Sequence, residues 1–186
     1  MTMRIAVVFA LITLFFALRM QRGSWGDPAL DCYTCYADNL LTGHGYWGDG
    51  YTLPGIPNAY RLPAYPIFLA ISATTFGRNA VIPFQAVLAS FIVFLVTGFV
   101  GRMTDKIMPT VVTGAIALSG HQLYYFASLT LTELFAAFTM TIFVIFFAQR
   151  RYIMAGATFG ILLLTRGSFV FTLPLILGVI LLCEKQ

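Results

Sequence analysis

Four long stretches of the chain contain no charged residue, and this feature constrains the fold more than any other. The stretches are Ile5–Leu18, Asn79–Gly101, Ile107–Thr132 and Gly167–Cys183. Only 10% of the 186 residues are charged, whereas a soluble domain has about a quarter. Because the surface of a water-soluble globule must be polar, the sequence predicts an integral membrane protein. The same composition excludes disordered, collagenous, disulfide-scaffold and nucleic-acid-binding proteins.

The first half of the chain contains two predicted membrane spans. Ile5–Leu18 is long enough to cross a bilayer when Met20 and Gln21 are included. No small-residue cleavage site follows it, so we interpret it as an uncleaved first span rather than as a signal peptide. Asn79–Gly101 is a full-length span.

Two apolar segments in the second half are too long for single spans. As one helix, Ile107–Gln149 would rise about 64 Å, twice the bilayer core, so it must form a hairpin with its turn at Gly120–Thr132. Tyr152–Cys183 would rise about 48 Å, and two short helices that meet near Arg166 explain its length. In total, we expect about five transmembrane helices.

The only long polar segment lies between the first two spans. Gln21–Arg61 is rich in Gly, Pro and Asp, which favour turns, but Ala29–Thr42 has the apolar spacing of a short amphipathic helix on the membrane surface. Leu62–Gly77 would rise only about 24 Å, which fits a tilted short span or, as we favour, a surface helix. We therefore expect one transmembrane domain over 1–186, with a loop and surface helices over 21–77.

The basic residues between the predicted spans fall on two sides of the membrane. The first side has one residue more than the second, and this excess favours an N-terminus in the cytoplasm with the 21–77 loop outside. The first side holds Arg4, Arg102, Lys106, Arg150, Arg151 and Lys185, and the second holds Arg19, Arg22, Arg61, Arg78 and Arg166.

Charged residues from distant segments are predicted to meet on the second side. Glu133 and Arg166 lie inside apolar sequence, where an unpaired charge is costly, so each needs a partner, water or a ligand. Glu133 is either a carboxylate that contacts solvent at the membrane interface or a functional residue. Arg166 either forms a structural pair, with Glu133 or with backbone carbonyls, or has a functional role. Arg61 is a candidate for phosphate recognition, because a guanidinium group matches phosphate oxygens.

Two aspartates near the start of the predicted surface helix have more than one interpretation. Asp27 and Asp31 can cap the helix, and Asp27 fits this role better because Pro28 follows it. Alternatively, a carboxylate there can deprotonate an acceptor hydroxyl or hold a divalent cation. We interpret Asp38 and Asp49 as solvated loop residues.

Cys32 and Cys35 have the spacing of a redox or zinc motif. No second pair of cysteines and no histidine cluster completes a metal site. We therefore favour the interpretation that both are small residues packed in a helix.

Four segments resemble a known family when taken together. The first two are Asp31–Tyr46 and Arg61–Ala70, the latter containing Arg-Leu-Pro-Ala-Tyr-Pro. The other two are Ser128–Phe135, with a Thr-Glu pair, and Ala155–Arg166, which is Gly-rich and ends in Leu-Thr-Arg. In order and spacing they resemble the N-terminal part of the GT-C membrane glycosyltransferases related to protein mannosyltransferases and lipid A aminoarabinose transferases.

The resemblance implies a function and a set of roles. Such enzymes have an all-helical fold and transfer a hexose or pentose from a polyprenyl-phosphate carrier to an exoplasmic acceptor, in the bacterial inner membrane or an equivalent one. The essential loop acid would be Asp31 or Asp27, with no certain cofactor beyond a possible divalent cation. The lipid-linked substrate would be bound by Arg61, Tyr65, Glu133 and Arg166.

A second hypothesis is not enzymatic. Members of the family are longer than this chain and have further spans. A shortened relative would serve as an accessory subunit that packs against other membrane subunits through small residues such as Gly156 and Gly160.

Overall fold

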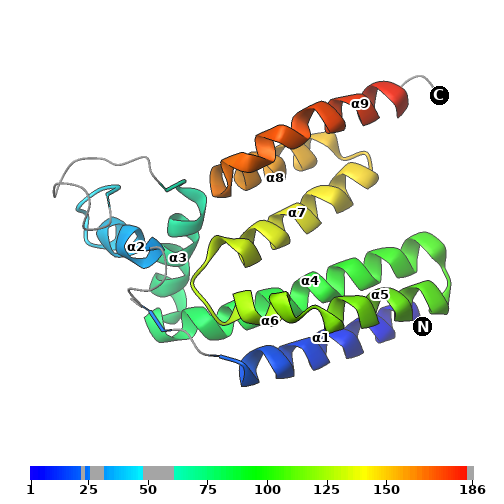
Figure 1. Ribbon diagram of the computed structural model, residues 1–186, viewed down its shortest axis with the longest axis horizontal. Coiled ribbons are helices and arrows are strands. Elements are labelled where there is room, and N and C mark those ends of the chain that lie inside the picture. The colour runs from blue at the N-terminus through cyan, green and yellow to red at the C-terminus, as the bar shows by residue number, and fades with distance from the viewer. Residues whose placement is uncertain (22–23, 26–31, 48–60, 184–186) are drawn as a thin grey trace.

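The computed structural model describes residues 1–21, 24–25, 32–47 and 61–183, and every regular element in these ranges is helical. Figure 1 shows the helices in two groups, α1, α4, α5 and α6 in one and α7, α8 and α9 in the other, with α2 and α3 at one end. This confirms the all-α prediction for the described part of the chain. Asp27, Asp31 and Asp49, and residues 29–31 of the predicted surface helix, lie outside it.

Helices α1 (Thr2–Arg19) and α4 (Val81–Thr104) pack side by side. Small residues allow the close approach, since Ala6, Ala10, Ala86 and Ala89 are all buried. The Ser90 hydroxyl also donates a 2.9 Å hydrogen bond to the carbonyl of Ala10. Without water in a bilayer core, such close backbone packing is a principal source of helix association.

The outer faces of these helices are apolar. On α1 the exposed side chains include Val8, Leu11 and Phe15, and Phe91 is exposed on α4. Soluble monomers rarely expose so much contiguous apolar surface, whereas lipid tails match it. Within the described residues, Thr2–Arg19 and Arg78–Thr104 are long and apolar enough to cross a membrane. These features confirm the coarse prediction of a membrane protein.

The chain then folds back through three helices. Helices α5 (Ile107–Ser119) and α6 (His121–Ala127) follow each other, and α7 (Thr132–Ala148) leaves α6 at an angle of 117°. The chain bends back within the predicted segment, but the turn is shorter than Gly120–Thr132 because α6 occupies most of it. The pair α6–α7 counts as a third candidate span if both helices belong to one crossing.

The last segment divides where the sequence predicted. Helix α8 (Tyr152–Thr165) ends at Arg166, the 3-10 turn η2 covers Gly167–Thr172, and α9 is Leu173–Cys183. Arg166 has an extended backbone (φ −144°, ψ 107°), which interrupts the helix and reverses the chain. The structure thus contains two short helices here instead of one.

Helices α2 (Tyr33–Leu41) and α3 (Ala64–Phe76) lie together across the end of the bundle (Figure 1). The 3-10 turn η1 (Arg78–Ala80) then connects α3 to α4. A cluster of aromatic rings joins α3 to the bundle, with Tyr65, Phe68 and Phe135 in mutual contact, and Tyr33 of α2 contacts Tyr65. The structure confirms a helix within Ala29–Thr42, although it begins at Tyr33, because Cys32 has a left-handed backbone.

Two predictions about α2 were wrong. Cys32 and Cys35 form a disulfide and are not merely packed as thiols. Asp38 is not a solvated loop residue, since it lies within α2 and pairs with Arg78 at 2.6 Å. The indole N–H of Trp25 also donates to the Asp38 carboxylate at 3.1 Å.

Candidate functional site

The pocket at the α2–α3 end of the bundle combines charged and polar side chains from four parts of the chain. Its volume is about 260 Å³. Tyr33 comes from α2, Arg61 precedes α3, Glu133 begins α7 and Arg166 ends α8. Thr132, Thr165 and Ser168 add hydroxyl groups to the lining. Three charged residues that the sequence predicted to meet, Arg61, Glu133 and Arg166, therefore share one pocket.

Glu133 and Arg166 form an ion pair across the pocket. The Nη1 group of Arg166 donates to Oε1 of Glu133 at 3.1 Å. Glu133 lies in the first turn of α7, where the helix dipole favours a carboxylate. Its second oxygen, Oε2, is buried and has no hydrogen-bond partner among the described residues. The sequence left open whether the two residues form a structural pair or serve a function, and the structure confirms the pair.

Arg61 lies against an aromatic face. Its guanidinium carbon is 5.1 Å from the centroid of the Tyr33 ring, within the range of a cation–π interaction. The backbone carbonyl of Arg61 accepts a 2.7 Å hydrogen bond from the Tyr46 hydroxyl. These contacts hold Arg61 beside α2 from both its side chain and its backbone.

Tyr65 supports the pocket from behind. Its side chain is fully buried, and its hydroxyl donates to Oε1 of Gln85 at 3.2 Å. Its ring meets Tyr33 edge-on with 5.3 Å between the centroids. Tyr65 is thus one layer behind the lining that includes Tyr33, although the sequence grouped it with the substrate-binding residues.

Tyr33 is an aromatic lining residue that the sequence analysis missed, as it missed the hydroxyl groups of Thr132, Thr165 and Ser168. It lies between the two cysteines of the disulfide, so the covalent loop Cys32–Cys35 encloses it. The only local signal was the Cys-Tyr-Thr-Cys spacing, which indicated redox or zinc chemistry and gave no role to the tyrosine. The side chain is almost fully buried among Tyr65 and Arg61, and this depends on segments distant in the sequence.

Near the pocket, the phenol group of Tyr46 stays neutral. Burial raises the pKa of Tyr46 above its ordinary value, and the nearby Tyr36 and Tyr33 add to the shift. Its hydroxyl therefore remains a hydrogen-bond donor to Arg61 throughout the physiological pH range.

The proposed acids are not among the described residues. Asp27 and Asp31 both lie outside the described ranges, and Asp31 directly precedes Cys32 in the sequence. Over the residues that the structure describes, no three His, Cys, Asp or Glu side chains lie close enough together to hold a metal ion. The carboxylate of the described pocket is Glu133.

Comparisons with known proteins identify no family for this chain. No protein-family model matches the chain, and neither a curated protein nor a solved structure matches it. The fold and pocket therefore define a helical membrane protein with a charged pocket at one end of its bundle.

Proposed function

We propose that the protein is a membrane glycosyltransferase of the GT-C type, which transfers a sugar from a polyprenyl-phosphate donor to an acceptor outside the cytoplasm. The observation that carries this proposal is the shared pocket of Arg61, Glu133 and Arg166. These residues come from three of the four segments that resemble the family, and nothing in their local sequences requires them to meet.

The charges of the pocket suit a phosphate leaving group. Its described lining has two guanidinium groups and one carboxylate, so its net charge is positive. A guanidinium group recognises phosphate oxygens through paired hydrogen bonds, and positive charge stabilises the phosphate as it departs. Glu133 would orient Arg166 through their 3.1 Å contact. The hydroxyl groups of Thr132, Thr165 and Ser168 would supply further hydrogen bonds.

The reaction also needs a base, and the resemblance assigns this role to Asp31 or Asp27. The carboxylate takes the proton of the acceptor hydroxyl while the oxygen attacks the anomeric carbon. The bond between that carbon and the phosphate oxygen breaks, and the polyprenyl phosphate leaves with the electron pair. Alternatively, the same carboxylate holds a divalent cation. Asp31 is two residues from Tyr33 in the sequence, which supports its choice.

We infer that the pocket faces outside the cytoplasm and that the chain crosses the membrane about five times. The spans would be α1, α4, α5 with α6, α7 and α8, and α9 would return from the chain reversal at Arg166 toward the cytoplasmic side. Helices α5 and α6 together rise about 30 Å, which matches a bilayer core. The disulfide supports this orientation, because disulfides persist in oxidising compartments and are rare in the cytosol.

The proposal is tested by transfer from a radiolabelled polyprenyl-phosphate sugar in proteoliposomes that contain the full chain. Wild type is expected to transfer the sugar, and R61Q and R166Q are expected to lose about a hundredfold or more, the scale of losing one donor to a developing charge. R78Q is the matched control, since Arg78 lies outside the pocket and pairs with Asp38. Full activity in a variant with both Asp27→Ala and Asp31→Ala would exclude the base assignment.

One observation favours the second candidate, an accessory subunit of a larger membrane complex. A Cβ atom added at Gly156 or Gly160 of α8 would meet no atom within 4 Å among the described residues. These small residues therefore do not pack within the described chain and remain able to contact another helix. Stable co-purification with a membrane complex, without any sugar transfer, would support this candidate over the first.

A further inference from the structure

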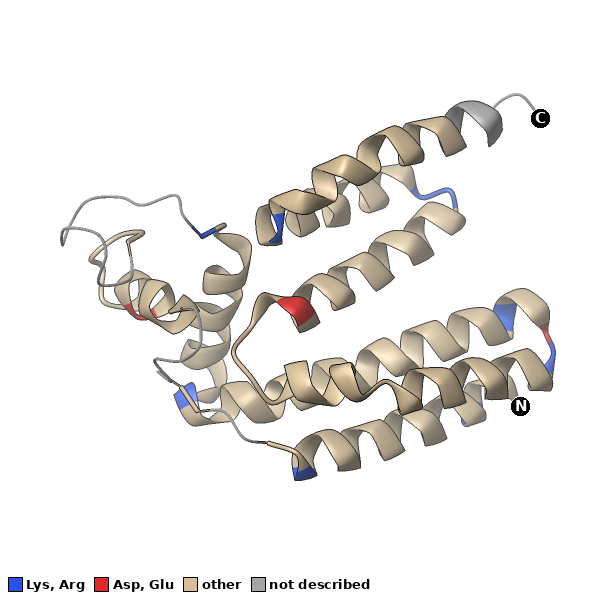
Figure 2. Cartoon of the chain, in the orientation of Figure 1, with Lys and Arg blue, Asp and Glu red and all other residues tan. Residues whose placement is uncertain are grey.

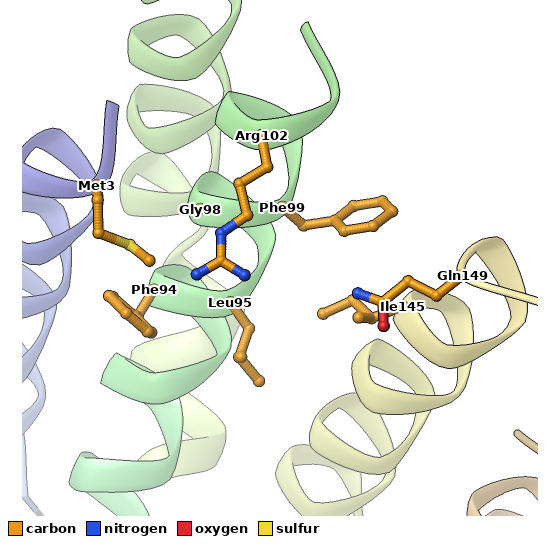
Figure 3. A pocket seen from close by; sticks show the side chains of 8 residues that line it. All are labelled: Met3, Phe94, Leu95, Gly98, Phe99, Arg102, Ile145 and Gln149. Carbon is orange, nitrogen blue, oxygen red and sulfur yellow. The ribbon is translucent and has the colours of Figure 1, made fainter. Parts of the chain in front are cut away.

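A second pocket lies at the opposite end of the bundle from the charged site. Glu133 and Gln149 mark the two ends of α7, and Gln149 lines this second pocket. Arg102, near the end of α4, and Met3, near the start of α1, lie beside it (Figure 3). The cavity has a volume of about 90 Å³, enough for a few water molecules or one phosphate-sized group.

Arg102 points into this pocket. Figure 3 shows its side chain running back along α4 past Gly98, with the guanidinium group near Met3 and Phe94. Arg102 is nevertheless an exposed residue, so its charge stays open to water or to a lipid head group. Within the described part of the chain, Arg102 has no ion pair and no side-chain hydrogen bond. An exposed cation beside apolar side chains at the end of a membrane helix favours an anionic head group at the membrane surface.

The pocket has both polar and apolar walls. Gln149 lines the α7 side of the pocket beside Ile145, and Arg102 lines the α4 side (Figure 3), so the pocket has a polar donor group on each of these sides. Phe94, Leu95 and Ile145 form an apolar wall between α4 and α7. A free inorganic anion makes no favourable contact with apolar side chains, whereas the glycerol backbone and first methylene groups of a lipid can pack against them.

The surrounding charge also favours an anionic ligand. Basic residues gather at this end of the described helices, and the one acidic residue beside them in the described chain is Asp105, at the end of α4. Each basic residue near a membrane surface adds to the attraction for anionic lipids. The basic residues are Arg4, Arg102, Lys106, Arg150 and Arg151.

We propose that this pocket binds the head group of an anionic phospholipid, with Arg102 donating to the phosphate oxygens, Gln149 contacting the head group from the α7 side, and the start of one acyl chain lying between α4 and α7. The site is separate from the charged pocket of the proposed transferase and does not depend on that activity.

The test measures lipid retention by the purified full chain. Protein is exchanged into nanodiscs of phosphatidylcholine with a graded fraction of phosphatidylglycerol, and bound lipid is counted by native mass spectrometry after release. Wild type is expected to retain phosphatidylglycerol over phosphatidylcholine, and R102Q is expected to retain it about tenfold less, as for the loss of one hydrogen bond to a charged group. R151Q, which removes a basic residue of the same end outside the pocket, is expected to change retention less than about twofold.

A second variant separates the pocket from the general charge of this end. Gly98→Leu keeps every charge and adds a side chain on the α1 side of the pocket, where a Cβ atom would lie 3.7 Å from Sδ of Met3, so it is expected to reduce retention as R102Q does. Unchanged helicity by circular dichroism and unchanged elution in gel filtration establish that both variants are folded. Equal losses in R102Q and R151Q, equal retention of the two lipids by wild type, or normal retention by folded G98L would each overturn the proposal. Displacement of bound lipid by millimolar inorganic phosphate alone would also overturn it, because the site would then be one for a free anion.

Discussion

Tyr33 provides an aromatic face for Arg61, with 5.1 Å between the guanidinium carbon and the ring centroid. This contact joins α2 to the segment that leads into α3, and Tyr65 extends it to the core behind the pocket. Figure 2 shows that the charged residues of the described chain lie mainly at the two ends of the helical bundle and around α2 and α3. The long middle of the bundle is apolar, so charged chemistry is confined to these ends.

Two substitutions of Tyr33 distinguish the contribution of its aromatic ring to donor binding from that of its hydroxyl group. Tyr33→Phe keeps the cation–π contact with Arg61, so donor binding should change little. Tyr33→Leu removes the contact, which is worth about 0.5–2 kcal/mol, and should raise the KM for the polyprenyl-phosphate sugar several-fold. The measurement is the KM for the donor in proteoliposomes. Equal KM values in the two variants would show that the ring does not hold Arg61.

The Glu133–Arg166 pair is expected to matter more for activity than for stability. Both side chains are partly exposed (29% and 44%), and such pairs stabilise proteins by about 1 kcal/mol or less. A double-mutant cycle with E133Q and R166Q, followed by thermal unfolding in detergent, should therefore give a small coupling energy. In the transfer assay both single variants should lose most of their activity.

The Asp38–Arg78 pair is the control for this cycle. Its side chains are similarly exposed (36% and 52%), and it lies outside the charged pocket. D38N and R78Q are expected to show a comparable small coupling in stability and nearly normal sugar transfer. A loss of transfer as large as that of R166Q would show that the effect comes from surface charge in general.

The features of the fold that could be predicted from the sequence are those that local patterns determine. Charge-free stretches identified α1 and α4, and the excess length of 152–183 predicted the break at Arg166, because neither depends on which helices pack together. These parts of the fold needed only helix length and bilayer thickness. Alternating spans also predicted that Arg61, Glu133 and Arg166 lie toward the same end of the bundle, but their meeting in one pocket depends on how the helices pack.

The missed features depend on contacts between distant segments. Asp38 pairs with Arg78, 40 residues further along the chain, so its local sequence resembled a solvated loop. Tyr33 became a pocket residue because Arg61 and Tyr65 surround it. The segment of helix α6 was predicted to be a turn because Gly120–Thr132 holds His121, two tyrosines, Ser128 and Thr130. Packing against α1 and α4 buries Tyr124 and Ala127 of this helix instead.

Two glycine substitutions are expected to have opposite effects on stability. A Cβ atom at Gly114 of α5 would lie 2.4–2.7 Å from ring atoms of Phe9 on α1, closer than real contacts allow. Gly114→Ala should therefore destabilise the fold by about 1–3 kcal/mol through overpacking. Gly156→Ala on α8 meets no described atom within 4 Å and should be neutral or stabilising by about 0.5–1 kcal/mol. Thermal unfolding of both variants in the same detergent checks this, and equal midpoints would contradict the α1–α5 packing.

The disulfide provides a test of orientation that does not require activity. Cys32 and Cys35 are bonded to each other, so neither reacts with a maleimide until the bond is reduced. A membrane-impermeant maleimide added to intact spheroplasts after mild reduction should label a C183S variant, because the α2 end is proposed to face outside the cytoplasm. The matched control carries C32S and C35S and retains Cys183, so the label should not reach it until the membrane is permeabilised. Labelling of C183S only after permeabilisation would place α2 and the charged pocket on the cytoplasmic side, where a polyprenyl-phosphate transferase with exoplasmic acceptors would have no substrate.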